Sequence, residues 1–174
     1  MKYAEHVSTV GLALALSMFA ACAGAAAVAN DDPEAMLLDI KRAIATPQVV
    51  TDFCIQQYPA SAQALRAAFV AWQRKNADLM FEVETRADRL TRGNSAGDEA
   101  EYKKRIETEK AALTQYRAAY TAELRRMPAS ASGPACAKYG TDLTNGEVNV
   151  SDLEKMFEAQ LKVIRRRDPE RGSR

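Results

Sequence analysis

Apolar residues recur every three or four positions along most of the chain, which is the spacing of amphipathic α-helices. Two long segments, about 61–92 and 98–127, carry such a stripe and are separated by Gly93–Gly97, a run of turn-forming residues. We therefore predict an all-α fold framed by a long antiparallel helical hairpin. At 1.5 Å per residue each arm would be roughly 45 Å long.

The two stripes of the hairpin also match each other in register. Pairing residues whose numbers sum to about 192 places Leu90 on Tyr102, Leu79 on Leu113, Asn76 on Tyr116, Trp72 on Tyr120 and Leu65 on Met127. Because neither stripe was defined with reference to the other, this agreement favours direct packing of the two arms along their length.

Three shorter helices are expected to form a small bundle at the open end of the hairpin. The first begins after Asp31 or Asp32 with Pro33 in its opening turn and ends at Pro47, and the second is capped by Thr46 and ends at Pro59.

The third short helix opens at a capping box, Ser151-Asp152-Leu153-Glu154, after a predicted loop over Ala129–Pro134. Leu161 and Ile164 lie on its apolar face, which we expect to cover the hairpin near Trp72 and Tyr120.

The first thirty residues have the pattern of a secretory signal. Lys2 precedes an apolar run from Val10 to Ala21, and small residues lead to Ala29. The run is shorter than the roughly 20 apolar residues of a membrane span. We therefore expect a signal peptide over 1–29, a single helical domain over 30–167 and a flexible basic tail over 168–174, with the protein periplasmic or secreted.

Cys22 supports an alternative way of processing the leader. The segment Phe19-Ala20-Ala21-Cys22 resembles the lipobox of bacterial lipoproteins, in which the cysteine is lipidated and becomes the mature N-terminus. In that alternative the signal ends before Cys22, and the protein is lipid-anchored in the envelope. Neither form leaves an integral membrane segment after processing.

Loss of the leader removes most catalytic chemistry, because His6 is the only histidine in the chain. Nucleophilic systems that depend on a histidine base and imidazole-ligated metals or haem are thereby excluded. No metal site or cofactor is expected. The full chain has 24 basic and 23 acidic residues, a balance that lacks the electrostatic footprint of a nucleic-acid-binding protein.

Two cysteines, Cys54 and Cys136, remain after the leader. An isolated pair in an oxidising compartment is best read as a disulfide. Because Cys54 precedes the first arm of the hairpin and Cys136 follows the second, the bond would close the open end. It would contribute about 4 kcal/mol in the chain-entropy description.

Two further regions could carry function. Between Glu82 and Lys110, 15 of 29 residues are charged, so the distal hairpin is either a solvated pair of helices or an arm that contacts another protein. The candidate contacts in this arm are Glu82, Arg86, Arg89, Arg92, Lys103, Lys104 and Arg105. The second region is a ligand pocket formed by Trp72, Asn76, Tyr116 and Tyr120, for which ordinary core packing is the alternative.

These features favour a non-catalytic helical envelope protein that binds another envelope protein, as a chaperone, adaptor, inhibitor or immunity protein would. The absence of histidine in the mature chain and the long charged hairpin both point this way. The alternative is a small-ligand-binding bundle or a carboxylate-dependent enzyme that uses the region around Trp72, Asn76, Tyr116 and Tyr120.

Overall fold

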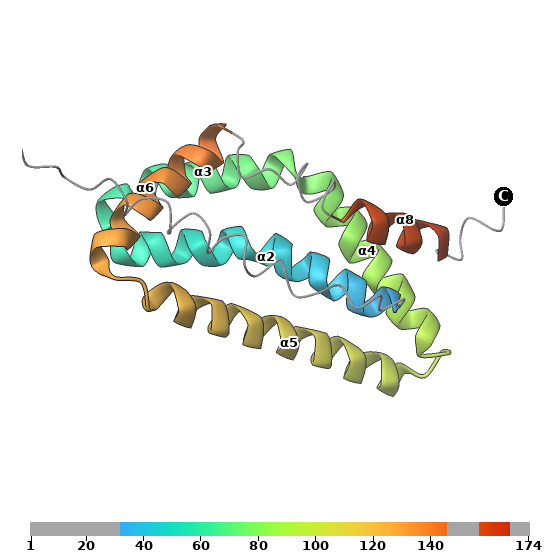
Figure 1. The fold of residues 1–174 in the computed structure, drawn as a ribbon. Coiled ribbons are helices and arrows are strands. Elements are labelled where there is room, and N and C mark those ends of the chain that lie inside the picture. Colours follow the sequence, from blue (N-terminus) through green and yellow to red (C-terminus); the bar gives the residue numbers. More distant parts are fainter. Residues whose placement is uncertain (1–31, 146–156, 168–174) are drawn as a thin grey trace, which may run out of the picture. The chain divides into compact units, whose positions relative to one another are not determined.

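The computed structural model describes residues 32–145 and 157–167, which are helical almost throughout (Figure 1). The elements are α2 (Pro33–Gln57), the 3-10 helix η1 (Pro59–Ser61), α3 (Ala62–Lys75), α4 (Ala77–Asn94), α5 (Glu99–Arg125), α6 (Ala129–Asn145) and α8 (Glu158–Arg167). The described residues contain no strand, so the all-α prediction is confirmed. The predicted signal peptide, Cys22, the capping box at Ser151 and the tail over 168–174 lie outside the described residues.

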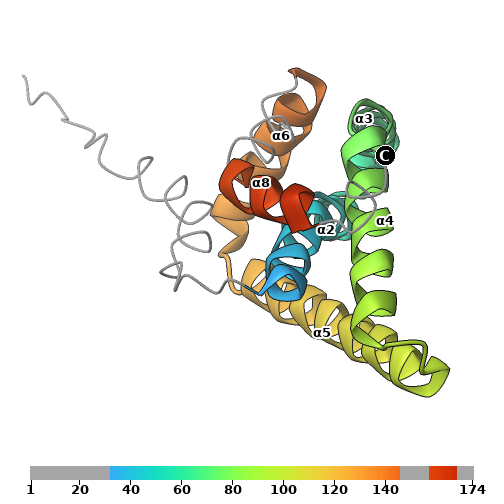
Figure 2. The same ribbon diagram turned by 90° about the vertical axis from the view of Figure 1, so that its right-hand side faces the viewer.

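Helix α2 is the central element of the domain. It contacts α3, α4, α5 and α8, and the view in Figure 2 shows these helices arranged around it. Its N-terminus forms as expected from the sequence: the Asp32 carboxylate accepts a hydrogen bond from the Glu34 N–H at 3.0 Å, and Pro33 occupies the first turn. The central helix therefore begins at a sequence-encoded cap.

The predicted helix boundary at Pro47 is wrong, because α2 continues through this residue. Proline removes one backbone hydrogen bond and typically costs about 3 kcal/mol in a helix interior. Pro47 is buried, and residues on both sides of it are packed against other helices, which offsets that cost. The Thr46 hydroxyl does not cap a new helix but donates to the Arg42 carbonyl at 3.1 Å within the same one.

The hairpin turn forms where the sequence places it. Helix α4 ends at Asn94, and the turn has left-handed backbone at Ala96 (φ 49°) and Gly97 (φ 85°), a conformation that glycine adopts without strain. Asp98 then caps α5, its carboxylate accepting from the N–H groups of Ala100 and Glu101 at 2.8 and 3.1 Å. Consecutive helices α4 and α5 thus form the distal hairpin.

The first arm of the hairpin is not one helix, since α3 and α4 are separated at Asn76. The Asn76 side-chain amide donates to the Trp72 carbonyl at 2.7 Å, so the side chain competes with the backbone for a helical acceptor. The break lets both α3 and α4 pack on α2.

The predicted register holds near the turn and fails farther along. Tyr102 of α5 bonds to Asp88 of α4, close to the expected position. Asn76 does not meet Tyr116, however, because α2 lies against α5 there and the Thr46 hydroxyl hydrogen-bonds the Tyr116 hydroxyl at 2.7 Å. Tyr120 packs against the core cluster that contains Trp72. The apolar stripe on α5 therefore packs mainly on α2 and not on the first arm of the predicted hairpin.

Two buried clusters form the core along α2. The first gathers residues of α2, α3, α5 and α6, namely Val49, Val50, Phe53, Cys54, Leu65, Phe69, Trp72, Leu124, Cys136, Tyr139 and Leu143. The second gathers residues of α2, α4 and α8, namely Leu37, Ile40, Val83, Ala87, Leu161 and Ile164. Leu79 packs against both clusters and joins them.

Helix α6 replaces the predicted loop over Ala129–Pro134, because it begins at Ala129 and contains Pro134. It carries Cys136, which forms the predicted disulfide with Cys54 of α2 across a Cα–Cα distance of 5.5 Å. Tyr139 of the same helix donates its hydroxyl to the Pro47 carbonyl at 3.0 Å. The disulfide and this hydrogen bond hold α6 to the C-terminal half of α2.

Helix α8 buries Leu161 and Ile164 as expected, but not at the expected place. These side chains pack with Leu37 and Ile40 of α2 and Val83 of α4, rather than near Trp72 and Tyr120. Along the two described stretches, none of the helices combines the length and apolar character needed to cross a membrane.

Candidate functional site

A hollow of about 400 Å³ lies where α2 begins and the α4–α5 hairpin turns. We call it the tip site. It is lined by residues of three helices: Asp32, Glu34, Ala35, Leu37 and Leu38 at the N-terminus of α2, Ala87 and Thr91 of α4, and Glu101, Lys104, Arg105, Thr108 and Glu109 of α5. Three helices that are separate in sequence therefore contribute to one concave surface.

Two capped helix starts hold the tip site in place. Asp32 caps α2 and Asp98 caps α5, and each cap fixes the first turn of a helix that lines the hollow. On the α4 side, the Ser95 hydroxyl donates to the Thr91 carbonyl at 2.7 Å and so extends the helix end toward the turn. The caps set the direction in which the first side chains of α2 and α5 point.

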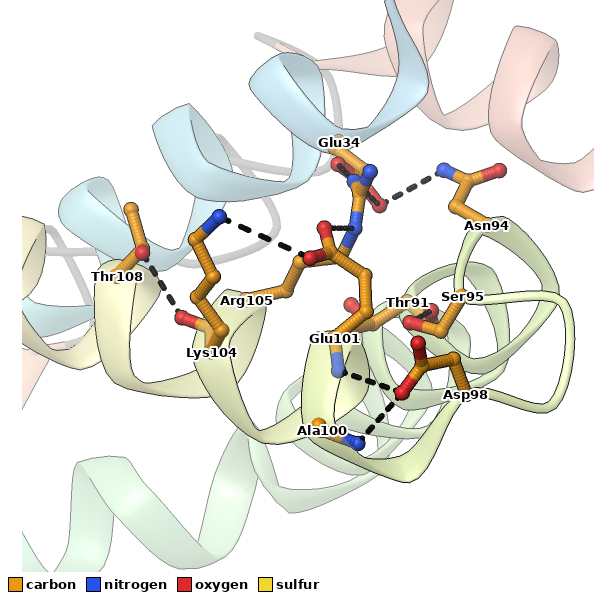
Figure 3. Close-up of polar contacts among 10 residues, drawn as sticks. All are labelled: Glu34, Thr91, Asn94, Ser95, Asp98, Ala100, Glu101, Lys104, Arg105 and Thr108. Carbon is orange, nitrogen blue, oxygen red and sulfur yellow. Dashed lines mark hydrogen bonds and ion pairs between the residues drawn. The ribbon is translucent and has the colours of Figure 1, made fainter.

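Glu34 is the polar link between α2 and the hairpin, as Figure 3 shows. Its carboxylate accepts a hydrogen bond from the Asn94 side-chain amide at 2.7 Å and from Arg105 Nη1 at 3.1 Å. Arg105 in turn donates through Nε to Glu101 at 2.9 Å. One guanidinium thus satisfies carboxylates on two helices and closes one side of the tip site.

The remaining wall combines an apolar floor with the weakly held Lys104, and Lys103 lies next to it outside the lining of the hollow. Leu37, Leu38 and Ala87 supply the floor. The side chain of Lys104 is 77% exposed and its Nζ lies 3.8 Å from Glu101 Oε2, while that of Lys103 is 69% exposed and lies 3.6 Å from Glu99. Exposed pairs at such distances contribute little to stability, so these two ammonium groups remain available for other anions.

A second polar cluster joins α4 to α5 beside the turn. Asp88 accepts from the Tyr102 hydroxyl at 2.6 Å and from Arg92 Nε at 2.9 Å, and the Arg92 guanidinium lies over the Tyr102 ring, 4.2 Å from its centroid. The hydrogen bond from Tyr102, followed by that from Arg92, lowers the pKa of Asp88. The same hydrogen bond raises the pKa of Tyr102. Arg92, one of the predicted arm residues, thus binds Asp88 of α4 and stacks on Tyr102 of α5, within the hairpin.

The structure divides the seven predicted arm residues between two places. Lys104 and Arg105 line the tip site, with Lys103 and Arg92 near the same turn, and Arg89 is half-buried on α4. Glu82 and Arg86 lie farther down α4, where Glu82 accepts both Arg165 Nε and Nη2 at 2.8 Å and Arg86 Nε at 2.8 Å. The predicted arm therefore contacts α2 near the hairpin turn, and it contacts α8 farther from the turn, at Glu82.

Glu82 is the anchor for α8. The hydrogen bond from Arg165 is the main cause that lowers the pKa of Glu82 to about 2; burial acts in the opposite direction, and Arg86 adds to the lowering. The sequence explained Arg165 only as a cation at a helix C-terminus. The residues next to Arg165 in the sequence do not indicate that it pairs with Glu82, which lies 83 positions earlier.

Lys41 is a further buried charge that the sequence interpretation did not identify. Its side chain is 6% exposed, and Nζ lies 2.6 Å from Glu109 and 2.8 Å from Glu84. Burial opposes the charge of Lys41, but the hydrogen bonds to Glu109 and then Glu84 outweigh it and raise the lysine pKa. The available signal was the position of Lys41 within the apolar stripe of Leu37, Ile40 and Ile44.

The four residues of the predicted ligand pocket have separate roles. Trp72 is buried and stacks on Phe69 with ring centroids 5.6 Å apart, while Asn76 is buried and bonded to the Trp72 carbonyl. Tyr116 is bonded to Thr46, and its ring stacks on that of Tyr120. These contacts are those of core packing and helix pairing.

The tip site presents paired carboxylates, an exposed ammonium group and an apolar floor. Glu34, Glu101 and Glu109 are each paired with a cation, and the described helices hold no cluster of three or more His, Cys, Asp or Glu side chains suited to a metal ion. An apolar floor beside exposed ammonium groups suits an apolar side chain flanked by carboxylates. No protein-family model matches the chain, and searches among curated proteins and solved structures likewise give no match.

Proposed function

We propose that this chain is an exported helical protein of the bacterial envelope that acts without catalysis by binding another envelope protein at the tip site. The observation that carries the proposal is the hollow of about 400 Å³ with Leu37, Leu38 and Ala87 in its floor and Lys104 at its edge. Apolar cavities with a polar rim are typical of the places where a partner inserts an anchoring side chain.

The charges of the tip site indicate the chemistry of the partner. The carboxylates of Glu34 and Glu101 are already bonded to Arg105, whereas Lys103 and Lys104 are exposed and held only at 3.6 and 3.8 Å. A partner segment with one apolar side chain and adjacent acidic residues would fill the floor and pair with Lys104, while Lys103 would add positive charge beside the hollow. Complementary charges of this kind chiefly raise the association rate and select the partner.

Export is supported by the leader pattern over 1–29 together with the Cys54–Cys136 disulfide. Disulfides of this type persist in oxidising compartments. The intact mass of the protein purified from the envelope tests this part of the proposal. A chain of residues 30–174 is expected; a mass that corresponds to a lipidated chain from Cys22 would establish the lipid-anchored alternative, and an uncleaved leader would contradict processing.

A binding experiment with a matched control tests the tip site. The native protein is immobilised and exposed to envelope extract, and bound proteins are quantified by mass spectrometry after cross-linking. The test variant is Lys103→Glu/Lys104→Glu. The control is Lys110→Glu/Arg117→Glu, which makes the same charge change at exposed positions of the same helix.

The expected result is a partner that the native protein and the control retain and that the test variant binds at least about tenfold more weakly, since a total loss of about 1.4 kcal/mol suffices for that factor. A second variant, Leu38→Asp, alters the floor and should lose the same partner. Equal retention of every bound protein by native protein and both tip variants would contradict the proposal, as would the absence of any bound protein.

A further inference from the structure

The outward side of α3 and α4 carries an unusual combination of exposed apolar and charged residues. Phe81 is 74% exposed and Val70 is 42% exposed, and these are the large apolar side chains most open to solvent in the described chain. Together with Arg66, Arg74, Asp78 and Glu84 they recur at steps of three or four residues, so they share one side of the helices. We call these six residues the outer face.

The bend at Asn76 places the outer face away from the core. Both α3 and α4 contact α2, and Figure 1 shows the two helices following one another along the side of the domain. The residues on their inner side, such as Phe69, Trp72 and Val83, are buried. Glu84 lies at the edge of the outer face, where its Oε2 reaches Lys41 of α2, and the other five residues lie on the side that no described helix covers.

Charge is distributed unevenly along the outer face. Helix α3 contains basic residues but no Asp or Glu, whereas the exposed charges of α4 next to Phe81 are Asp78 and Glu84. Arg66, Arg74 and Asp78 form no ion pair within the described stretches, and Glu84 uses Oε2 to pair with Lys41. The face is thus basic on one side of the Asn76 break and acidic on the other.

We infer that a second copy of this chain packs on the outer face, antiparallel and related by a two-fold axis near Asn76. Residues whose numbers sum to about 151 would then face each other. Val70 would pack on the second copy's Phe81, Arg74 would lie beside its Asp78, and Arg66 beside its Glu84. Two-fold symmetry forms each of these contacts twice.

Charge complementarity is what identifies a second copy as the occupant. An antiparallel arrangement places the basic α3 on the acidic α4 and matches both apolar side chains, whereas a parallel arrangement would oppose like charges. Within each helix the charged residues flank the apolar one: Arg66 and Arg74 lie four residues to either side of Val70 on α3, and Asp78 and Glu84 lie three residues to either side of Phe81 on α4. No other surface is needed to complete the match.

The contact is expected to be weak. It extends from Arg66 to Glu84, and the bend around α2 curves the ends of the face away from a partner. Interfaces at the low end of the size range are typically transient. We expect a monomer–dimer equilibrium with a dissociation constant on the order of 100 µM.

Sedimentation equilibrium of the full processed protein, from about 5 µM to 1 mM, tests the inference. Phe81→Ser should weaken dimerisation by at least tenfold, and Arg74→Asp and Asp78→Arg should each weaken it. The double variant Arg74→Asp/Asp78→Arg should recover most of the native affinity, because the swapped charges meet again across the axis. Lys110→Asp on α5 is the matched control and should leave the equilibrium unchanged.

All exchanged side chains are exposed, so unchanged far-UV circular dichroism is expected and separates loss of association from loss of folding. A native protein that stays monomeric at 1 mM would overturn the inference, as would dimerisation that does not respond to Phe81→Ser or that the charge exchange fails to restore. The inference would also be overturned if the native protein stays monomeric and binds a different protein that Phe81→Ser releases. The outer face is separate from the tip site, so either proposal can fail without the other.

Discussion

Removing the counter-charges of the buried Lys41 should lower the free energy of unfolding more than removing Lys41 itself. Its Nζ links α2 to Glu109 of α5 and Glu84 of α4 at 2.6 and 2.8 Å. Only 6% of the lysine side chain is exposed, compared with 25% for Glu109 and 69% for Glu84. Water can therefore solvate the two carboxylates when the lysine is absent, but it cannot reach the ammonium when the carboxylates are absent.

Two variants separate these cases. Glu84→Gln/Glu109→Gln leaves a buried ammonium without a counter-charge, and breaking a buried pair in this way costs about 3–5 kcal/mol of unfolding free energy. Lys41→Met replaces the base with an apolar chain of similar length next to Ile40, and leaves acids that can rehydrate. We expect it to cost no more than about 1–2 kcal/mol, because the large penalty for a broken pair arises from a buried unpaired charge, and Glu84 and Glu109 are more exposed than Lys41.

Urea denaturation followed by circular dichroism at pH 7 measures both losses, with Lys104→Met at an exposed position as a control that should change stability by no more than about 0.5 kcal/mol. The native lysine pKa is raised, so the stabilisation it provides is complete below its ordinary value of 10.5 and is lost as pH rises beyond that value. In the double glutamine variant the loss should shrink toward high pH, because a neutral amine is easier to bury. A larger loss for Lys41→Met than for the double variant at pH 7 would refute the reasoning.

Three further predictions concern the contacts that hold α6 and α8. Replacing Cys54 and Cys136 together by alanine should lower the unfolding free energy by about 4 kcal/mol and the melting temperature by roughly 10–15 °C, measured by calorimetry; unchanged melting would contradict the assigned bond. Glu82→Gln should cost about 1–2 kcal/mol at pH 7 after allowance for solvent screening, because it weakens the pairing with Arg165. The pKa of Glu82 is lowered to about 2, so this difference from the native protein should be complete above pH 4.5 and disappear as pH falls toward 2; a difference that stays constant over that range would argue against the pairing. Tyr139→Phe removes the hydroxyl that donates to the Pro47 carbonyl and should cost about 1 kcal/mol in urea denaturation, whereas no loss would show that the hydrogen bond adds nothing to stability.

Features set by neighbouring residues were predictable from the sequence. The Asp32 cap, the turn before Asp98 and the buried positions Leu161 and Ile164 all appear where the local pattern places them. The disulfide followed from the number of cysteines and the inferred compartment. In each case the deciding interaction lies within a few residues or allows only one pairing.

Features decided by tertiary packing were not predictable in the same way. Pro47 normally ends a helix, but burial of α2 on both sides of it maintains one helix of 25 residues. The Ala129–Pro134 segment has the composition of a loop, yet packing of Cys136 and Tyr139 against α2 stabilises a helix from Ala129. The apolar stripes of the two hairpin arms match in the sequence, but in the structure the stripe of α5 packs mainly on α2.

The tip site was predictable only in part. Lys104 and Arg105 belonged to the charged arm, and both line the hollow. Glu34 could not be connected with them from the sequence, because its bond to Arg105 spans 71 positions and depends on where α2 begins relative to the hairpin. A surface formed by the start of α2 and by the distant α4–α5 hairpin has no signature in either segment alone.

The position of α2 has a consequence for the order in which this protein can be assembled during synthesis. The helix around which the others pack is also the first helix of the domain to be made, and it must wait for partners as distant as Arg105, Tyr116 and Cys136. Its apolar side chains stay without cover until most of the chain has emerged, and contacts so far apart in sequence slow folding. A chain that stops before α6 would have α3, α4 and α5 on its central helix, but it would lack α8, α6 and the disulfide that ties α6 to α2.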